Sequence, residues 1–320
     1  APVSLPYGLM YPFEHMRAGL SSACASLFGE HAPLLNAMLW GVKGGISDSV
    51  YDAFRSCGIA HILALSGLHV SFVAGALNRL ARRARPKVRF YISMAVLFSY
   101  CAIAAFPSSL IRASVMSLCS LYAAAAGRRY DMPSGIAFSA IVILLADPTA
   151  LYSIGFELSF GAVIMISLLM RPVTELLSFL PLPIAQMTAL SVCGTLGTLP
   201  LSVYYFGTIP VLGLFANTLI LPMVPFVFLS AMAVNLIGAA MPAAAKALSF
   251  IPMFLTGVMT EAANAISSVS FAVKQAAITP LVCLFVYLAC FAVSDQPLVS
   301  PSKKYAACAA SLFAAVLCML

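Results

Sequence analysis

Charged residues are scarce in this chain of 320 residues. Asp, Glu, Lys and Arg together make up 8% of it, whereas a soluble domain carries about 25%. Hydrophobic residues supply 62%. A soluble fold needs polar side chains to cover its surface, so this composition excludes an ordinary soluble domain. A lipid bilayer removes that need because it solvates apolar faces itself. We therefore expect an all-α integral membrane protein.

Several catalytic motifs are also missing. The chain has no Walker motif, so we do not expect it to hydrolyse ATP. It has no CxxC pair and no Cys/His zinc spacing, so we expect no metal and no cofactor. It has no HExxH or GxGD pair. A Ser66–His69 pair on one helical turn is poorly placed for proton transfer, and we expect no enzymatic activity.

The nine cysteines fall into two groups. Cys24 and Cys57 lie in the polar N-terminal part and could form a disulfide. The others lie in apolar runs and behave as small hydrophobic residues: Cys101, Cys119, Cys193, Cys283, Cys290, Cys308 and Cys318.

Residues 1–56 are the least apolar part of the chain. The pattern predicts amphipathic helices over Phe13–Phe28 and Ala32–Val42, and a short helix after an N-cap at Ser47. We expect 1–56 to be an amphipathic lead-in on the outer membrane face, followed by a polytopic transmembrane domain over 57–320. Because the chain starts at Ala1 without Met and ends in an apolar run, we expect a fragment of a longer protein.

Apolar runs long enough to cross a bilayer, or nearly so, fill the rest of the chain. We predict a bundle of about ten transmembrane helices, over 57–78, 88–106, 108–127, 133–147, 151–170, 184–206, 209–240, 243–268, 275–293 and 305–320. The run 209–240 is too long for one span and is rich in Pro and Gly. We expect a broken or re-entrant helix near 209–222, which is tolerated only beside protein or a wet cavity.

The net charge of +7 is explained mainly by cytoplasmic loops, which collect Lys and Arg in membrane proteins. The densest basic cluster is predicted to face the cytoplasm: Arg79, Arg82, Arg83, Arg85, Lys87 and Arg89. Counting spans from it places Arg128–Arg129, Arg171, Lys246 and Lys303–Lys304 inside as well. It places Pro107, Asp147–Pro148 and Gly207 outside, and only Lys274 disagrees.

Two charged residues lie inside predicted spans, where charge is costly. At about 1.5 Å per residue, Arg112 is roughly 6 Å and Glu157 roughly 9 Å below the outer boundary. Their similar depth and opposite charge predict an ion pair. The alternative is that each side chain reaches the interface without a partner.

The predicted 57–78 helix carries a sparse polar stripe. His69 lies near its middle, Ser66 lies one turn away, and His61 lies two turns before His69 on nearly the same face. These residues could line a pore or relay protons, or they could hydrogen-bond to a neighbouring helix.

The Ser191-x-x-Gly194-x-x-Gly197 pattern predicts a close helix contact.

Several segments, in order, resemble the competence domain of the ComEC family over residues 40–295. Gly58, His61, Leu63, Ala64, Ser66, Gly67, Leu68, His69 and Val70 are similar to its GxxHxLAxSGLHV helix. Similar segments follow at Pro107–Ala113, Gly127–Arg129, Asp147–Pro148, Gly155–Phe160, Thr198–Gly207 and Asn217–Pro222. Glu157 is a departure, because the family carries Gln there.

The resemblance implies a channel that imports single-stranded transforming DNA across the bacterial cytoplasmic membrane. It implies partners: single-stranded DNA, membrane lipid, a DNA receptor and a cytoplasmic helicase or ATPase; a homo-oligomer is left open. Family members often carry an OB-like domain before this region and a nuclease-like domain after it. Candidate residues along the DNA path are His61, Ser66, His69, Arg112, Glu157 and Asn217.

Two alternatives bear on this reading. A small-molecule secondary transporter shares broken helices and buried charges, but the sequence shows no internal repeat. The aromatic run Tyr204–Phe206 could stack on the bases of a single strand. It is equally typical of the aromatic belt at a membrane interface, which is the interpretation we favour.

Overall fold

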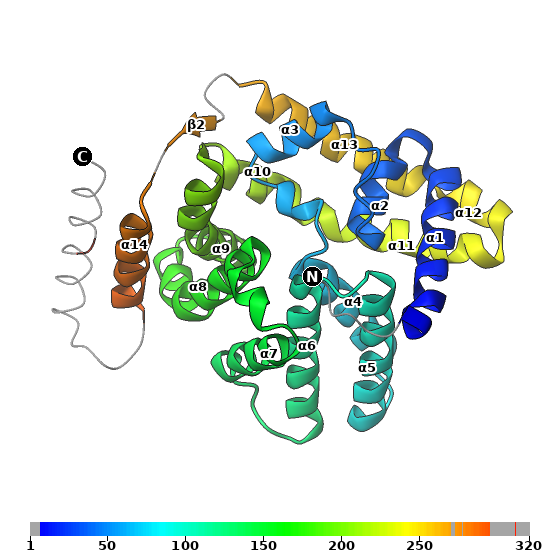
Figure 1. The fold of residues 1–320 in the computed structure, drawn as a ribbon, viewed down its shortest axis with the longest axis horizontal. Coiled ribbons are helices and arrows are strands. Elements are labelled where there is room, and N and C mark those ends of the chain that lie inside the picture. The colour runs from blue at the N-terminus through cyan, green and yellow to red at the C-terminus, as the bar shows by residue number, and fades with distance from the viewer. Residues whose placement is uncertain (1–6, 270–272, 277, 295–310, 312–320) are drawn as a thin grey trace. The chain divides into compact units, whose positions relative to one another are not determined.

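The structure is a computed structural model that describes residues 7–269, 273–276, 278–294 and 311 (Figure 1). The chain divides into two compact units, residues 1–150 with 219–269 and residues 151–218 with 270–320. Both units are built from helices, as expected. The one exception among the described residues is a pair of three-residue strands.

The helices of unit 1 are α1 (Tyr7–Phe28), α2 (Ala32–Trp40), α3 (Asp48–Ser56), α4 (Gly67–Leu80), α5 (Pro86–Ile103), α6 (Ser108–Ala125), α7 (Met132–Ala146), α11 (Val224–Ala240), α12 (Pro242–Leu248) and α13 (Phe250–Ser267). Unit 2 holds α8 (Ile154–Leu176), α9 (Leu182–Phe206), β1 (Thr208–Pro210), β2 (Val273–Gln275) and α14 (Pro280–Val293). Helix α10 (Gly213–Ile220) crosses the boundary between the units.

Helix α2 forms the centre of unit 1. It packs against α1 and α11, and Leu35, Met38 and Leu39 are completely buried. Its residues are buried on all sides rather than on one amphipathic face. Gly41 ends the helix in the left-handed conformation (φ 70°), which glycine adopts without strain. The lead-in therefore supplies core as well as surface.

The predicted helix after Ser47 is confirmed. Ser47 has the extended backbone of an N-cap, and its hydroxyl accepts a hydrogen bond from the backbone N–H of Val50 at 3.4 Å. This bond satisfies one of the N–H groups that a helix start leaves unpaired. The helix α3 that follows buries Phe54 and packs against α13.

The predicted helix over 57–78 is wrong in its first half. Gly58 (φ 70°) turns the chain after α3, a 3₁₀ turn η2 (Ala60–Ile62) follows, and α4 begins only at Gly67. Ile59 and Ile62 are fully buried, so this apolar run is core rather than the start of a span. At about 1.5 Å per residue, the 14 residues of α4 extend roughly 21 Å, less than the hydrocarbon thickness.

Five helices in the described part of the chain are long and apolar enough to cross a membrane: Ser108–Ala125, Ile154–Leu176, Leu182–Phe206, Phe215–Ala240 and Pro242–Ser267. Two shorter apolar helices are Met132–Ala146 and Pro280–Ala292. The predicted count of about ten is therefore not confirmed. The last predicted span, 305–320, lies outside the described residues except for residue 311.

The predicted break near 209–222 is a local change of helix type within the run Phe215–Ala240, which is counted as one helix of spanning length. A 3₁₀ turn η4 (Leu221–Met223) separates α10 from α11, and the prolines at 222 and 225 remove the N–H groups that a continuous helix would use. Whether α10 re-enters the membrane stays a prediction.

The two short strands join segments that are far apart in the sequence. β1 pairs antiparallel with β2, and Ile209 lies opposite Lys274. Lys274 is thus held beside the C-terminal end of α9, next to Gly207, which was predicted to be outside. The structure therefore places Lys274 on the same side as Gly207, as the span count does, although the positive-inside rule would place a lysine on the other side.

Candidate functional site

Ser66 and His69 form the start of helix α4. Ser66 is the N-cap, and its backbone N–H donates to Nδ1 of His69 at 3.0 Å. The Ser66 hydroxyl lies 3.2 Å from the same nitrogen. This is a capping box in which histidine takes the place of the usual Glu or Gln. Because Nδ1 accepts from the backbone, the ring is a neutral tautomer with its proton on Nε2.

The imidazole of His69 is completely buried among aromatic rings. The ring centroid of Phe228 on α11 lies 4.8 Å away, and that of Phe72 lies 6.4 Å away with an edge-on orientation. Nε2 is buried and has no hydrogen-bond partner among the described residues. A buried N–H without an acceptor is costly. His69 therefore presents an unused donor within unit 1.

The N-terminal turn of α6 packs against this capping box. The Ser109 hydroxyl donates to the Leu65 carbonyl at 2.6 Å. A methyl group on Gly67 would lie 3.3 Å from Nη2 of Arg112 and 3.4 Å from Cβ of Ala113. Gly67 thus lets the Arg112 side chain, which is 5% exposed, approach the start of α4. Two segments 44 residues apart become one polar cluster.

A strained turn sets the position of Arg112. Ala105 (φ 62°) and Phe106 (φ 51°) both adopt the left-handed conformation between α5 and α6, which costs energy for residues other than glycine. The Phe106 N–H donates to the Cys101 carbonyl at 2.8 Å. This turn reverses the chain, so that α6 returns antiparallel to α5 with Ser109 and Arg112 in its first turns.

The geometry corrects the expectation that Ser66 and His69 are too poorly placed on one helical turn for proton transfer. The hydroxyl and Nδ1 lie within hydrogen-bond distance because Ser66 is an extended N-cap rather than a helical residue. However, the Ser66 N–H also donates to Nδ1. The ring nitrogen that would have to take the hydroxyl proton is therefore shared with a structural bond.

Glu157 lies in unit 2 and has a partner that the sequence did not suggest. The hydroxyl of Tyr205 on α9 donates to Oε2 of Glu157 on α8 at 2.7 Å. Arg112 belongs to unit 1, so the predicted Arg112–Glu157 ion pair stays a prediction. Tyr205 belongs to the run interpreted as an aromatic belt, and no local pattern links its hydroxyl to a carboxylate 48 residues away.

The remaining two path candidates have different settings. His61 lies in η2 with an exposed side chain, and it does not share a helix with His69. The predicted polar stripe of these two residues is therefore wrong, because the chain between them is not helical. Asn217 lies in α10, and its Oδ1 is buried without a hydrogen-bond partner among the described residues.

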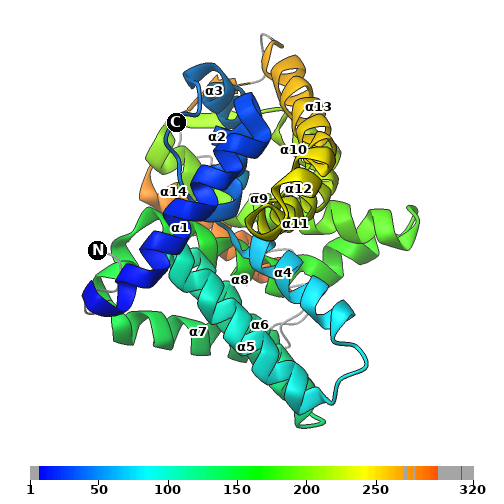
Figure 2. The ribbon, with the colours of Figure 1, turned by 90° about the vertical axis from the view of Figure 1, so that its right-hand side faces the viewer.

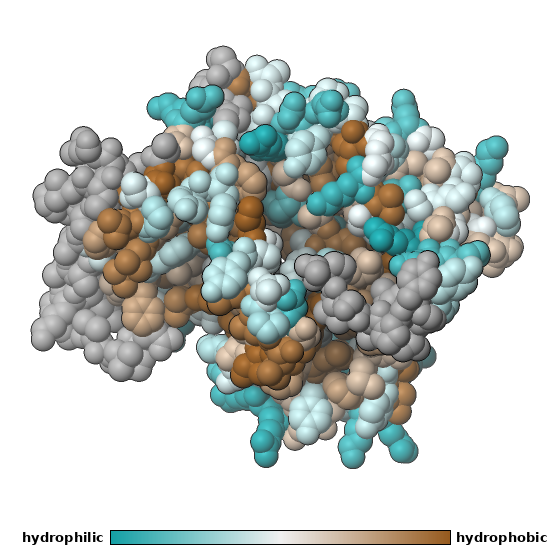
Figure 3. Space-filling view, in the orientation of Figure 1, coloured by the Kyte–Doolittle hydropathy of each residue, from teal (hydrophilic) through white to brown (hydrophobic). Residues whose placement is uncertain are grey.

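The basic cluster occupies the end of α4, the loop after it and the first turn of α5. Helix α6 runs antiparallel to α5, and the ring centroids of Phe90 near the start of α5 and Tyr122 near the end of α6 lie 5.8 Å apart. The loop with Arg128 and Arg129 therefore lies at the same end of these helices as the cluster (Figure 2). Figure 3 shows hydrophilic side chains projecting where this end lies, below a band of hydrophobic ones. This agrees with placing both basic groups on one membrane side.

The candidate cysteine pair does not form. Cys24 and Cys57 are both free and buried. The Cys24 thiol is directed at the Ala32 carbonyl, and the Cys57 thiol donates to the Ala263 carbonyl at 3.3 Å. The described residues also hold no group of three or more His, Cys, Asp or Glu that could bind a metal ion.

Large apolar side chains on the long helices are exposed. Phe226 is 67% exposed and Phe254 is 70% exposed, and such surfaces need lipid or protein to cover them. Together with five helices of spanning length, they define a helical membrane protein.

The comparison with known sequences then gives the family. The chain belongs to the Competence protein family, which it matches over residues 38–296, in agreement with the resemblance seen over 40–295. It is 27% identical over 230 residues to "ComE operon protein 3" of Bacillus subtilis, and 32% identical over 139 residues to "Competence protein ComA" of Neisseria gonorrhoeae. An uncharacterized protein of Aquifex aeolicus is 32% identical over 159 residues.

These matches cover 71%, 41% and 49% of this chain, but only 29%, 20% and 34% of those proteins. The chain thus corresponds to about a third or less of each relative. No solved structure matches it.

Proposed function

We propose that this chain is the membrane conduit through which single-stranded transforming DNA enters across the bacterial cytoplasmic membrane. Membership of the Competence protein family and the apolar helices support this. Residues 57–320 would form the channel, with 1–56 on the outer face. The partners would be the DNA strand, membrane lipid, a DNA receptor outside and a helicase or ATPase inside. A secondary transporter is the less favoured alternative.

The observation that carries the proposal is the polar cluster of Ser66, His69 and Arg112. A strand with one negative charge per nucleotide needs hydrogen-bond donors to replace lost hydration. Arg112 supplies a guanidinium, and His69 supplies a buried N–H that no described residue uses. Both come from segments that characterise the family resemblance. The chain itself is proposed to be non-enzymatic and free of cofactors.

The test separates a role of His69 in the path from its role in the cap. In the full-length protein, His69→Leu removes both the capping acceptor and the free N–H. His69→Glu keeps an acceptor suited to a capping box but its carboxylate has no N–H to donate. Both variants should reduce DNA internalisation, while DNA still binds outside the cell and the protein reaches the membrane in normal amounts.

The Ser66→Leu/His69→Leu double variant should abolish internalisation, since it adds bulk and removes the donors. Phe254→Leu on the exposed surface of α13 is a control that should transform normally. Wild-type uptake by the double variant at normal abundance would exclude this helix start from the DNA path. Wild-type uptake by His69→Glu, with loss only in His69→Leu, would restrict His69 to capping α4.

A further inference from the structure

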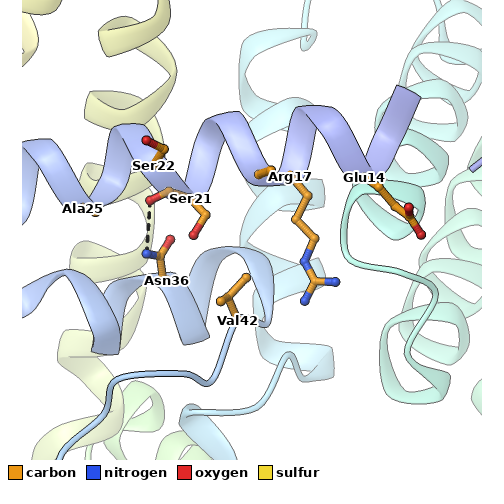
Figure 4. Close-up of a pocket in the computed structure, with 8 residues that line it drawn as sticks. Glu14, Arg17, Ser21, Ser22, Ala25, Asn36 and Val42 are labelled. Atoms are coloured by element: carbon orange, nitrogen blue, oxygen red, sulfur yellow. Dashed lines mark hydrogen bonds between the residues drawn. The ribbon is translucent and has the colours of Figure 1, made fainter. Parts of the chain in front are cut away.

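A groove lies between α1 and α2 in unit 1, with a volume of about 550 Å³. Figure 4 shows its polar side chains: Arg17 and Ser21 project from α1 towards α2, Asn36 projects from α2 towards α1, and Glu14 lies at one end. Small residues on α1 keep the groove open. None of the residues proposed for the DNA path lines it.

Asn36 supplies an unused acceptor to this groove. Its side-chain N–H donates to the Ser21 carbonyl at 3.2 Å. Since that carbonyl can only accept, the amide nitrogen must face it, and the oxygen is directed elsewhere. Asn36 is 7% exposed, and its Oδ1 is buried without a partner among the described residues. A ligand N–H would satisfy it.

Arg17 supplies unused donors beside it. Its Nη2 donates to the Gly41 carbonyl at 3.3 Å, which ties the guanidinium to the end of α2. Its Nε is buried and has no partner among the described residues. Arginine binds phosphate oxygens well because its N–H groups form a planar fork. The groove therefore joins a phosphate-binding group to an acceptor for a ligand N–H.

We propose that this groove binds the zwitterionic phosphoethanolamine headgroup of a membrane phospholipid. The phosphate pairs with Arg17, and the ammonium donates to Asn36 Oδ1 on one side of Arg17. Glu14 lies on the other side (Figure 4) and contributes the negative charge that offsets the guanidinium. One guanidinium and one carboxylate line the groove, which suits a ligand of zero net charge. No aromatic ring is among the described residues that line it, so a nucleotide would lack a stacking surface.

The test measures which lipids the full-length protein retains. The protein is placed in nanodiscs with equal amounts of phosphatidylethanolamine, phosphatidylcholine and phosphatidylglycerol, and native mass spectrometry identifies the bound lipid. Phosphatidylethanolamine should be enriched about tenfold over phosphatidylcholine, whose methylated nitrogen has no N–H to donate. Asn36→Leu should lower this preference towards parity, and Arg17→Gln should reduce retention of both lipids. Glu14→Gln leaves the groove with a net positive charge and should raise retention of the anionic phosphatidylglycerol.

Glu30→Gln is the matched control, because Glu30 is exposed and lies outside the groove; it should keep the preference. Glu14 is also exposed, so Glu14→Gln stays informative even if Asn36→Leu fails to fold. Equal retention of the three lipids, or retention of phosphatidylglycerol that Glu14→Gln leaves unchanged, would overturn the proposal. Binding of soluble glycerophosphoethanolamine in place of the lipid would exclude a membrane phospholipid as the ligand of this groove. The assay contains no DNA, so its outcome is independent of the proposed function.

Discussion

Gly161 of α8 and Gly197 of α9 meet where neither helix has room for a side chain. A methyl group on Gly161 would lie 2.7 Å from the carbonyl oxygen of Gly197, closer than real Cβ contacts. The close contact predicted from the Ser191–Gly197 pattern is thus confirmed at Gly197. It does not extend to Gly194, where a methyl group would have no neighbour within 4 Å.

This contact predicts a large effect of a single methyl group. Gly161→Ala should force α8 and α9 apart and lower the free energy of unfolding by about 1–3 kcal/mol. Gly155→Ala, on the same helix with nothing within 4 Å, should be neutral or slightly stabilising. Thermal unfolding in detergent would measure both. Equal stability of the two variants would mean that the helices do not cross at Gly161.

The hydrogen bond between Tyr205 and Glu157 gives a second prediction. Tyr205→Phe removes the donor and should lower the melting temperature, whereas Tyr204→Phe should not. Glu157→Gln, which restores the residue of the resembling family, keeps an acceptor oxygen and should cost less than Glu157→Leu. Tyr205→Phe and Glu157→Leu should be non-additive, because both remove the same bond.

The same Glu157 variants test the predicted ion pair with Arg112. If the two charges interact, Arg112→Ala combined with Glu157→Gln should recover part of the stability that each single change loses. Strictly additive losses of stability for Arg112→Ala and Glu157→Gln would show that these two residues do not interact. If Tyr205 and Glu157 are coupled as well, Tyr205 is the partner of the carboxylate.

The basic end of unit 1 gives a prediction of topology. Because the two basic loops lie at one end of α5 and α6, single cysteines at Arg83 and at Arg128 should behave alike in a cysteine-free protein. Both should resist an impermeant thiol reagent applied to intact cells. A cysteine at Thr149, in the exposed turn predicted to be outside, should react. Labelling at Arg83 but not at Thr149 would reverse the orientation.

Burial of the Cys24 thiol predicts how it responds to pH. Burial raises the pKa of Cys24 to about 12, so the native thiol keeps its proton where an unfolded one would ionise. This site therefore stabilises the native state fully below the ordinary thiol pKa of about 9, and the contribution falls as the pH rises from there towards 12. Cys24 should react with iodoacetamide at pH 8 only after unfolding, and mass spectrometry of its peptide would show this. Rapid native labelling, or a Cys24–Cys57 disulfide, would contradict the structure.

The sequence by itself determined the membrane class, the helical fold and the family. Scarce charge and long apolar runs require lipid as a solvent, and that argument does not depend on packing. Local signals were also sufficient for the Ser47 cap and for the irregular turn at Leu221–Met223, because a hydroxyl before a helix and a proline inside one act on neighbouring backbone groups.

Only the tertiary structure decided where apolar runs stop being spans. Hydropathy cannot distinguish a buried loop from a lipid-facing helix, so Ile59 and Ile62 appeared to belong to a span although they fill the core of unit 1. Pairings between distant segments were equally hidden. The approach of Arg112 to Gly67 depends on a left-handed turn at Ala105 and Phe106, and the Glu157–Tyr205 bond depends on two glycines that bring α8 and α9 together. Such contacts join residues far apart in the chain, and no periodicity in the sequence records them.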